Sequence, residues 1–406
     1  HAAPGTSSLT AYFYQQLWHI MGDPLTGVVQ AIFKGSKPTP CQRTSLMVFG
    51  NKPGKKAKSL KISDRRKLSL LNVDFKLLTG IEAAQIRKTM HKTISPLQLV
   101  SGGNKRISHG IAMARDAISA TSDNKVRCGI LDTDLIAAFC NMVVTWCLQV
   151  MYRKGLDPAV IARYRNLYDD NFSIIVVNGV QGRCVKNTRM SVRQGDKFAM
   201  ELFSFGMDPI LGYLKRRLTG ILIHSAPVQG PVLLPLHPPP PPPSLPTSIP
   251  GLPDLPPRPP TQQLLPATFR ASLPPLETRY YLFAYCDDVK PAVTSLWEFR
   301  LIERVMTIFE KASGCMMHRS IESKKCKFLP LGKWRTELTQ AMIPHGFFTL
   351  SDKLDFLGVT FKSTFMATRK ANGDILKECI KNVIGPWKGG LFMPLNMRSH
   401  SVNTYG

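Results

Sequence analysis

Hydrophobic and polar positions follow two periods along this chain, and each period predicts a kind of element. Residues 172–187 and 281–295 alternate between apolar and polar side chains around short turns, which predicts two β-hairpins. A basic hairpin is expected over 47–67, and an apolar strand over about 128–132. Apolar residues that recur with a helical period predict helices over about 8–20, 24–33, 73–120, 196–218 and 296–313.

Two of these helical segments contain residues that interrupt a helix. Residues 73–120 are punctuated by Pro96 and Gly102-Gly103, and their periodic apolar positions begin with Leu77, Ile81, Ala84 and Ile86. The segment from 196 to 218 contains Pro209, which lacks a backbone N–H donor. We therefore expect a kink or an early end of the helix at Pro209.

Residues 227–275 differ in composition from the rest of the chain. They contain 19 of its 32 prolines, including an unbroken run from 238 to 243. Proline neither donates to a strand ladder nor sustains a helix, so we expect an extended or disordered insertion here. A partner that binds polyproline is compatible with this stretch, but nothing in the sequence requires one.

The charge of the chain favours a polyanionic partner. Fifty-three Lys and Arg residues stand against 27 Asp and Glu residues, which gives a formal net charge of +26. Binding to an anionic membrane surface is the competing interpretation. No basic amphipathic helix with a strong apolar face supports it, and no apolar run has the ~18 residues that span a bilayer. Nucleic acid is therefore the better interpretation, because each neutralised phosphate releases counterions.

Cysteine usage and the chain ends indicate the compartment. The nine cysteines are odd in number and lack Cys-x-x-Cys spacing, which predicts reduced thiols in an intracellular protein without structural zinc. The chain starts at His1 without a signal-peptide pattern and stops at Gly406 without a terminating feature, so we expect truncation at both ends.

The chemistry-bearing stretch is the hairpin at 281–295. An apolar strand leads to Asp287-Asp288, which we expect to form a tight turn before a second strand rich in Val and Thr. Two adjacent carboxylates repel each other, and a divalent cation removes that penalty. Their hard oxygens suit magnesium or manganese. Taken alone, such a pair more often fills a solvated turn, because Asp is a common turn residue.

A second acidic pair lies upstream, where the strand at about 128–132 ends in Asp132 and Asp134. If the two strands end together, Asp134 lies beside Asp287, as in sites where two metal ions clamp a displacement at phosphorus. Both Asp132 and Asp134 are candidates for this place.

Three motifs in order now resemble a known family. Tyr285-Cys286-Asp287-Asp288 resembles the Tyr-x-Asp-Asp box of reverse transcriptases. The stretch from Asp134 to Phe139 resembles their preceding Asp-x-x-x-Ala-Phe-Asp box, and counting back from Phe139 favours Asp134 over Asp132. Arg193-Gln194-Gly195-Asp196 resembles their Arg-Gln-Gly-Asp box. The set is most similar to the polymerase of non-LTR (LINE-type) retrotransposons.

The resemblance implies an α+β fold with fingers and a palm built on an antiparallel sheet. The implied parts are fingers and linker (1–125), a first palm part (126–225), the proline-rich insertion (226–278), a second palm part (279–360) and a connection to a truncated thumb (361–406). It also implies an RNA-directed DNA polymerase that uses two Mg²⁺ ions (Mn²⁺ is possible), deoxynucleoside triphosphates, an RNA template and a DNA primer. The nucleus and cytoplasm are the expected locations.

The same resemblance implies roles for individual residues. The expected metal ligands are Asp134, Asp287 and Asp288, and either Lys324 or Lys325 is expected to protonate the leaving group. The expected nucleotide contacts are Arg66, Phe139, Arg193, Gln194 and Gly195. Primer or template contacts are expected from Lys52, Lys55, Tyr285, Leu357 and Gly358.

Departures from the family pattern keep other interpretations open. Cys140 and Lys67 replace a family Asp and Pro, so a catalytically decayed nucleic-acid-binding remnant is an alternative. An RNA-dependent RNA polymerase is another, although the bulk of Phe139 favours deoxynucleotides. Phe139 would equally serve as an ordinary core aromatic.

Overall fold

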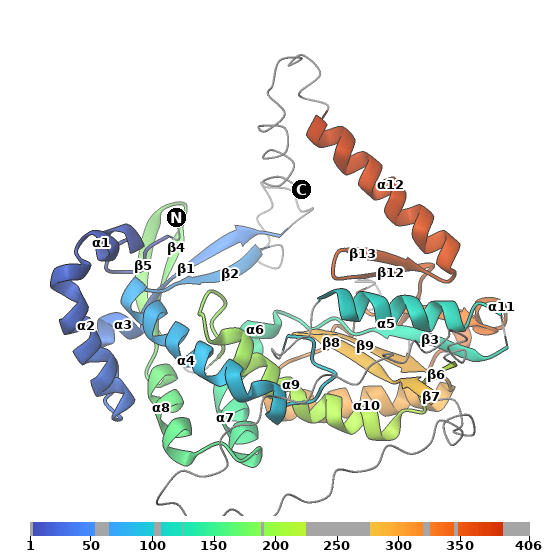
Figure 1. Ribbon diagram of the computed structural model, residues 1–406, viewed down its shortest axis with the longest axis horizontal. Helices are drawn as coiled ribbons and strands as arrows, with labels where there is room; N and C mark the ends of the chain where they lie inside the picture. The colour runs from blue at the N-terminus through green and yellow to red at the C-terminus, as the bar shows by residue number, and fades with distance from the viewer. Residues whose placement is uncertain are drawn as a thin grey trace, which may run out of the picture. The chain divides into compact units, whose positions relative to one another are not determined.

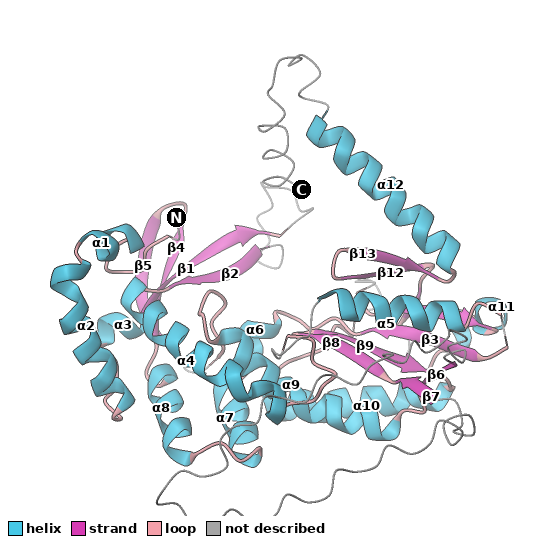
Figure 2. Cartoon of the chain, in the orientation of Figure 1, coloured by secondary structure: helices cyan, strands magenta, loops and turns pink. Residues whose placement is uncertain are grey.

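The structure is a computed structural model that describes residues 3–52, 65–100, 107–123, 125–187, 191–224, 277–319, 325–344 and 348–384. The chain divides into two units, the first formed by residues 1–221 together with 280–406, and the second by Leu222–Arg279. Helices and strands are mixed along the first unit (Figure 1 and Figure 2), which makes it an α+β fold. Lys55, Lys324 and most of the proline-rich segment lie outside the described residues.

Helices account for most of the regular structure. They are α1 (Ala11–Gln16), α2 (Trp18–Phe33), α3 (Pro40–Arg43), α4 (Val73–Thr93), α5 (Ile107–Ala120), α6 (Ala138–Asn141), α7 (Val144–Arg153), α8 (Pro158–Tyr168), α9 (Ala199–Arg217), α10 (Leu296–Ser313), α11 (Trp334–Glu337), the 3-10 helix η4 (Gln340–Met342) and α12 (Phe365–Ile384).

Proline interrupts neither of the two longer helices that contain it. Pro24 lies inside α2, and Pro209 lies inside α9, which continues to Arg217. The expected break at Pro209 is therefore wrong. Most of α9 is buried, including Leu202, Phe205 and Leu211. Tertiary packing on several sides outweighs the roughly 3 kcal/mol that an interior proline costs.

A four-stranded sheet has the order β2-β1-β4-β5. Its strands are β1 (Thr44–Asn51), β2 (Arg65–Leu70), β4 (Phe172–Val177) and β5 (Val180–Lys186). The expected hairpins over 47–67 and 172–187 are both confirmed, because β1 pairs antiparallel with β2 and β4 pairs antiparallel with β5. Between them, β1 and β4 run parallel.

A five-stranded sheet has the order β11-β10-β3-β9-β8. Its strands are β3 (Arg127–Asp132), β8 (Leu282–Tyr285), β9 (Asp288–Val293), β10 (Lys327–Gly332) and β11 (Thr349–Leu350). All pairs are antiparallel except the parallel pair of β10 and β11. In Figure 1, α10 lies on one side of this sheet and α5 on the other. The strands β12 (Lys353–Phe356) and β13 (Val359–Lys362) form a separate hairpin, and β6 (Ile221–His224) pairs with β7 (Glu277–Tyr280).

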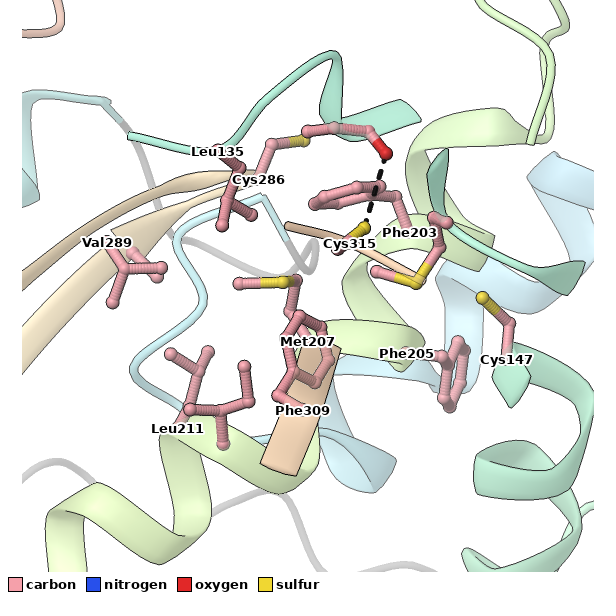
Figure 3. Close-up of a cluster of buried hydrophobic side chains, with 14 of the residues drawn as sticks. Leu135, Cys147, Phe203, Phe205, Met207, Leu211, Cys286, Val289, Phe309 and Cys315 are labelled. Carbon is pink, nitrogen blue, oxygen red and sulfur yellow. Dashed lines mark hydrogen bonds between the residues drawn. The ribbon is translucent and has the colours of Figure 1, made fainter. Parts of the chain in front are cut away.

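The hydrophobic core lies directly behind the acidic residues. Leu135, Cys286 and Val289 are each next in sequence to an acidic residue, and all three are buried in one cluster with residues of α9 and α10 (Figure 3). In the same cluster the Cys315 thiol donates a hydrogen bond to the Ala138 carbonyl at 3.3 Å. The burial of Leu135, Cys286 and Val289 therefore holds the neighbouring acidic residues at the edge of the core.

All nine cysteines lie in the described part of the chain and are free thiols, as the sequence predicts. Burial raises the pKa of the Cys286 thiol to about 12, so it stays protonated beside the acidic residues. None of the helices in the described part of the chain is long and apolar enough to cross a membrane.

Candidate active site

Asp134 is held between two anchored residues just past the end of β3. The Thr133 N–H and hydroxyl both donate to the Val289 carbonyl, at 3.3 and 3.0 Å. On the other side Leu135 forms a bridge with Met317. The backbone of Asp134 is therefore fixed to β9 and to the segment after α10, while 39% of its side chain stays exposed.

The acidic hairpin turns one residue earlier than the sequence suggests. Tyr285 pairs with Asp288, so the turn consists of Cys286 and Asp287, and Asp288 is the first residue of β9. Cys286 has a positive φ of 54°. The expected turn at Asp287-Asp288 is therefore wrong by one residue, because the chain reverses at Cys286 and Asp287. The side chain of Cys286 is buried.

Gln98 holds this turn. Its side-chain oxygen accepts a hydrogen bond from the Cys286 N–H at 3.0 Å, and its amide nitrogen donates to the Cys286 carbonyl at 3.3 Å. The neighbouring backbone also pairs with β8, since the Leu99 N–H donates to the Ala284 carbonyl at 2.8 Å. Gln98 is fully buried, so both bonds are made away from water.

Asp287 is affected by the negative charge of Asp134. Burial raises the pKa of Asp287, and the negative charge of Asp134 raises it further. The positive charges of Lys290 and Arg66 act in the opposite direction. Arg66 lies on β2 of the other sheet, so the charge of that basic strand reaches the acidic turn.

Basic side chains also lie beside Asp134. The ammonium of Lys325 and the Nε2 atom of His318 each lie 3.6 Å from its Oδ2 atom. Burial lowers the pKa of His318, Asp134 raises it, and Lys325 and Lys52 lower it. The structure thus brings the predicted residues Lys325 and Lys52 to the neighbourhood of Asp134.

Asp132 and Asp288 share a different partner. The Lys290 ammonium lies 2.6 Å from Asp132 Oδ1 and also contacts Asp288 Oδ1. Burial raises the pKa of Asp288 to about 6, and Lys290 opposes that shift. Because the buried ammonium of Lys290 holds Asp132 at 2.6 Å, whereas 39% of the Asp134 side chain is exposed, the geometry favours Asp134 over Asp132 for the proposed site.

Phe139 lies on the short helix α6. Its half-buried ring packs on Phe203 of α9, with the ring centroids 4.6 Å apart. Its neighbour Cys140 is also half-buried; burial raises the pKa of this thiol, and the charge of Lys67 opposes that shift. Phe139 thus has a packing role, and its predicted contact with the sugar stays a prediction.

Arg193 is placed differently from its expected role. Its guanidinium lies inside the protein, 4.7 Å from the Phe75 ring centroid and 5.3 Å from that of Tyr168. It donates to the Arg43 carbonyl at 3.4 Å, and its side chain is 4% exposed. A group enclosed in this way does not reach a nucleotide, so the structure corrects this expectation to a structural role.

The residues after Arg193 dock the loop before α9 onto the basic strand β2. The Gln194 carbonyl accepts a hydrogen bond from the Ser69 N–H at 2.8 Å. Gly195 has φ +115°, and a Cβ atom there would lie 2.5 Å from the Ser69 carbonyl oxygen. Asp196 accepts from the Phe198 N–H at 3.1 Å, just before α9 begins. Gly195 is therefore required for docking this loop onto β2.

The remaining predicted contacts lie at two turns. Tyr285 ends β8 and packs half-buried against the core. Leu357 and Gly358 form the turn between β12 and β13, with φ of 52° and 81°. This hairpin contacts β8, because the rings of Phe356 and Phe283 lie 4.4 Å apart. The predicted primer-gripping turn therefore belongs to the same side of the structure as the acidic hairpin.

The pair Asp134 and Asp287 is the part of this site that fits a divalent cation. No group of three or more His, Cys, Asp or Glu side chains has the spacing of a metal site in the part of the chain that the structure describes. Magnesium, however, is commonly held by one or two carboxylates together with substrate phosphates. Asp134 and Asp287 supply hard carboxylate oxygens of this kind, and a cation would offset the repulsion that raises the pKa of Asp287.

Sequence reasoning missed two residues of this site, Gln98 and Lys290. Gln98 belongs to no recognisable motif, and its role becomes visible only through its hydrogen bonds to Cys286 in the structure. Lys290 interrupts an otherwise apolar strand in the sequence. This could have indicated its role, because a charged residue in a buried strand requires a partner.

Comparisons with known proteins support the resemblance suggested by the motifs. The chain is 22% identical over 404 residues to the "Transposon TX1 uncharacterized 149 kDa protein" of Xenopus laevis. This match covers 98% of the chain but only 26% of that protein, so the chain spans about a quarter of its relative's length. The predicted similarity to a transposon-encoded protein is confirmed. No protein-family model matches the chain.

Solved structures with a similar fold include three telomerases. Apo telomerase from Candida tropicalis, truncated from the C-terminal domain, has a TM-score of 0.45 and 7% identity over 86% of this chain and 59% of its own. Telomerase from Candida albicans with a fragment of telomeric RNA has a TM-score of 0.42 and 10% identity over 87% and 49%. The corresponding Candida tropicalis complex has a TM-score of 0.43 and 9% identity over 95% and 61%. Similarity at this level assigns no role to any residue of this chain.

Proposed function

We propose that this chain is the polymerase part of a retrotransposon protein and adds deoxynucleotides to a primer 3′-hydroxyl on an RNA template. The observation that carries the proposal is the pairing of Thr133, next to Asp134, with Val289 of β9, the strand that follows Asp287. Burial and the charge of Asp134 raise the pKa of Asp287, and a divalent cation would offset that repulsion.

Each neighbouring residue has a role in this proposal. Magnesium or manganese ions held by Asp134 and Asp287 would supply positive charge to the triphosphate and to the attacking oxygen. Arg66 on β2 binds the triphosphate, since its charge already reaches Asp287. Lys325 donates a proton to the pyrophosphate leaving group, because its ammonium lies 3.6 Å from Asp134. Phe139 limits the space at the 2′ position of the nucleotide.

The experiment is primer extension on poly(rA)/oligo(dT) with dTTP or UTP. Extension with dTTP supports the reverse transcriptase. A preference for UTP would instead indicate an RNA polymerase. Duplex binding without extension would indicate a decayed remnant, an alternative that gains weight from the contact of Lys290 with Asp288.

A further inference from the structure

Lys290 is a buried cation inside the acidic hairpin. It lies on β9, two residues after Asp288, and 2% of its side chain is exposed. Its ammonium lies 2.6 Å from Asp132 Oδ1, contacts Asp288 Oδ1 and lies 5.6 Å from the centroid of the Phe356 ring. Three elements, β3, β9 and β12, therefore enclose one positive charge.

This enclosure keeps the ammonium charged. Burial alone would favour a neutral amine, but the carboxylates of Asp132 and Asp288 both contact the ammonium and compensate its charge. A buried charge persists only where partners compensate its lost hydration. Lys290 therefore acts as a permanent counter-ion for the two carboxylates that contact it.

Lys290 contacts two of the four acidic residues at this edge of the sheet, Asp132 and Asp288. The other two, Asp134 and Asp287, form a second pair, in which Asp134 has exposed surface. Charge also acts between the pairs, from Asp134 on Asp132 and from Asp287 on Asp288. A divalent cation at the second pair would experience the positive charge of Lys290 from the first.

We propose that Lys290 is a positioning residue that keeps Asp288 in an internal ion pair and thereby weakens divalent-cation binding at Asp134 and Asp287. This inference rests on the proposed function, because it concerns the same site. In the protein without nucleotide, two carboxylates beside a fixed ammonium bind a cation weakly, and the phosphates of a bound nucleotide would complete the coordination. Cation binding is then coupled to nucleotide binding.

A role in fold stability alone makes the opposite prediction for a variant. Replacing a purely structural lysine leaves cation binding unchanged or damages it. If Lys290 opposes the cation, its removal instead tightens cation binding, because a repulsive charge disappears and Asp288 becomes available. Tighter binding is a result that damage to the fold does not produce.

The test is a titration of the full chain with Mn²⁺, followed by the EPR signal of free Mn²⁺, without nucleotide. We expect Lys290→Met to tighten Mn²⁺ binding by at least about 10-fold. Lys327→Met is the matched control: Lys327 lies opposite Asp132 on β10 and acts on it by charge alone, so a smaller gain is expected. Unchanged or weaker binding in a folded Lys290→Met protein would overturn the inference.

Two further variants separate folding from binding and the inference from the function. If Lys290→Met does not fold without metal, the double variant Lys290→Met with Asp132→Asn removes one unpaired carboxylate and should show the same gain. Adding Asp287→Asn to Lys290→Met, or to the double variant, should abolish the tighter Mn²⁺ binding. Tighter binding that persists would contradict the inference. Primer extension by the wild-type chain tests the proposed function separately: tighter binding without any extension would reject the polymerase and retain the role of Lys290.

Discussion

Asp287 is the carboxylate on which the proposed chemistry depends most directly, because it lies in the hairpin turn and interacts with Asp134. We expect Asp287→Asn to lower primer extension by at least about 100-fold, since the variant loses a charge needed in the transition state. Binding of a template–primer duplex should stay nearly unchanged. Asp116→Asn on α5, which removes an exposed carboxylate paired with Arg115, is the control for charge. Extension by Asp287→Asn at the wild-type rate would contradict the metal assignment.

Phe139 combines a packing contact with a predicted contact to the sugar. Its ring is only half-buried on Phe203, so Phe139→Val should cost less than the ~3–5 kcal/mol of a fully buried Phe→Ala change. If the ring also limits the 2′ position, the variant raises the ratio of kcat/KM for UTP to that for dTTP. Steady-state kinetics beside a thermal melt decide this. A lower melting temperature with an unchanged ratio would leave Phe139 as a core aromatic only.

The acidic residues that the sequence predicted for this site are those with a local pattern. Asp134 and Asp287 follow apolar strands, and their motifs fix their order. Arg193, Gln98 and Lys290 were misjudged or missed because their roles depend on buried partners elsewhere in the chain. A periodic pattern shows that a polar residue lies among apolar ones, but it does not show which group binds its polar atoms.

Among the elements, α10 was predicted best. Helix α10 spans Leu296–Ser313 as expected, because Ser295 and Glu298 form a capping box and Gly314 ends the helix with φ +77°. Helix α4 also exists, but Leu77 and Ile81 of its expected apolar face are exposed. The expected position Ile86 is buried, together with Val73, Phe75, Leu78, Ala83 and Met90. Apolar residues lie on more than one side of α4, so neighbouring elements decide which side is buried.

Gly195 gives a prediction about the contact between two elements. Gly195→Ala would place a Cβ atom 2.5 Å from the Ser69 carbonyl oxygen at a φ of +115°, so the loop before α9 must move away from β2. We expect a loss of stability larger than the ~1–2 kcal/mol that an unfavourable φ alone costs. Denaturant unfolding of the two proteins measures this loss.

Gly179→Ala is the matched control for that change. Gly179 also has a positive φ, +82°, but an added Cβ atom there meets nothing within 4 Å. Its cost should therefore be that of the backbone conformation alone. Equal losses in both variants would show that the contact of Gly195 with β2 does not stabilise the protein.

For the whole molecule, the two units predict how the proline-rich segment bears on folding. Deleting residues 231–260 removes sequence only from the unit Leu222–Arg279. The sequence assigns this stretch no core contact, and the entropy of closing a loop depends only weakly on its length. We expect the melting temperature to change by less than about 2 °C, the shift that a fraction of 1 kcal/mol produces. A cooperative loss of folding would show that the segment packs against the rest of the chain.

The net charge predicts how the molecule binds nucleic acid as a whole. With 53 Lys and Arg residues against 27 Asp and Glu residues, most of the affinity for a template–primer duplex should come from released counterions. If about 6–10 phosphates are neutralised, affinity falls by about 10³–10⁵ between roughly 50 and 200 mM salt. Fluorescence anisotropy of a labelled duplex measures this slope.

Asp287→Asn should keep the same slope, because duplex binding depends on the basic surface and the acidic pair acts only on the bound nucleotide. Binding that does not change with salt would mean that the excess positive charge serves another purpose.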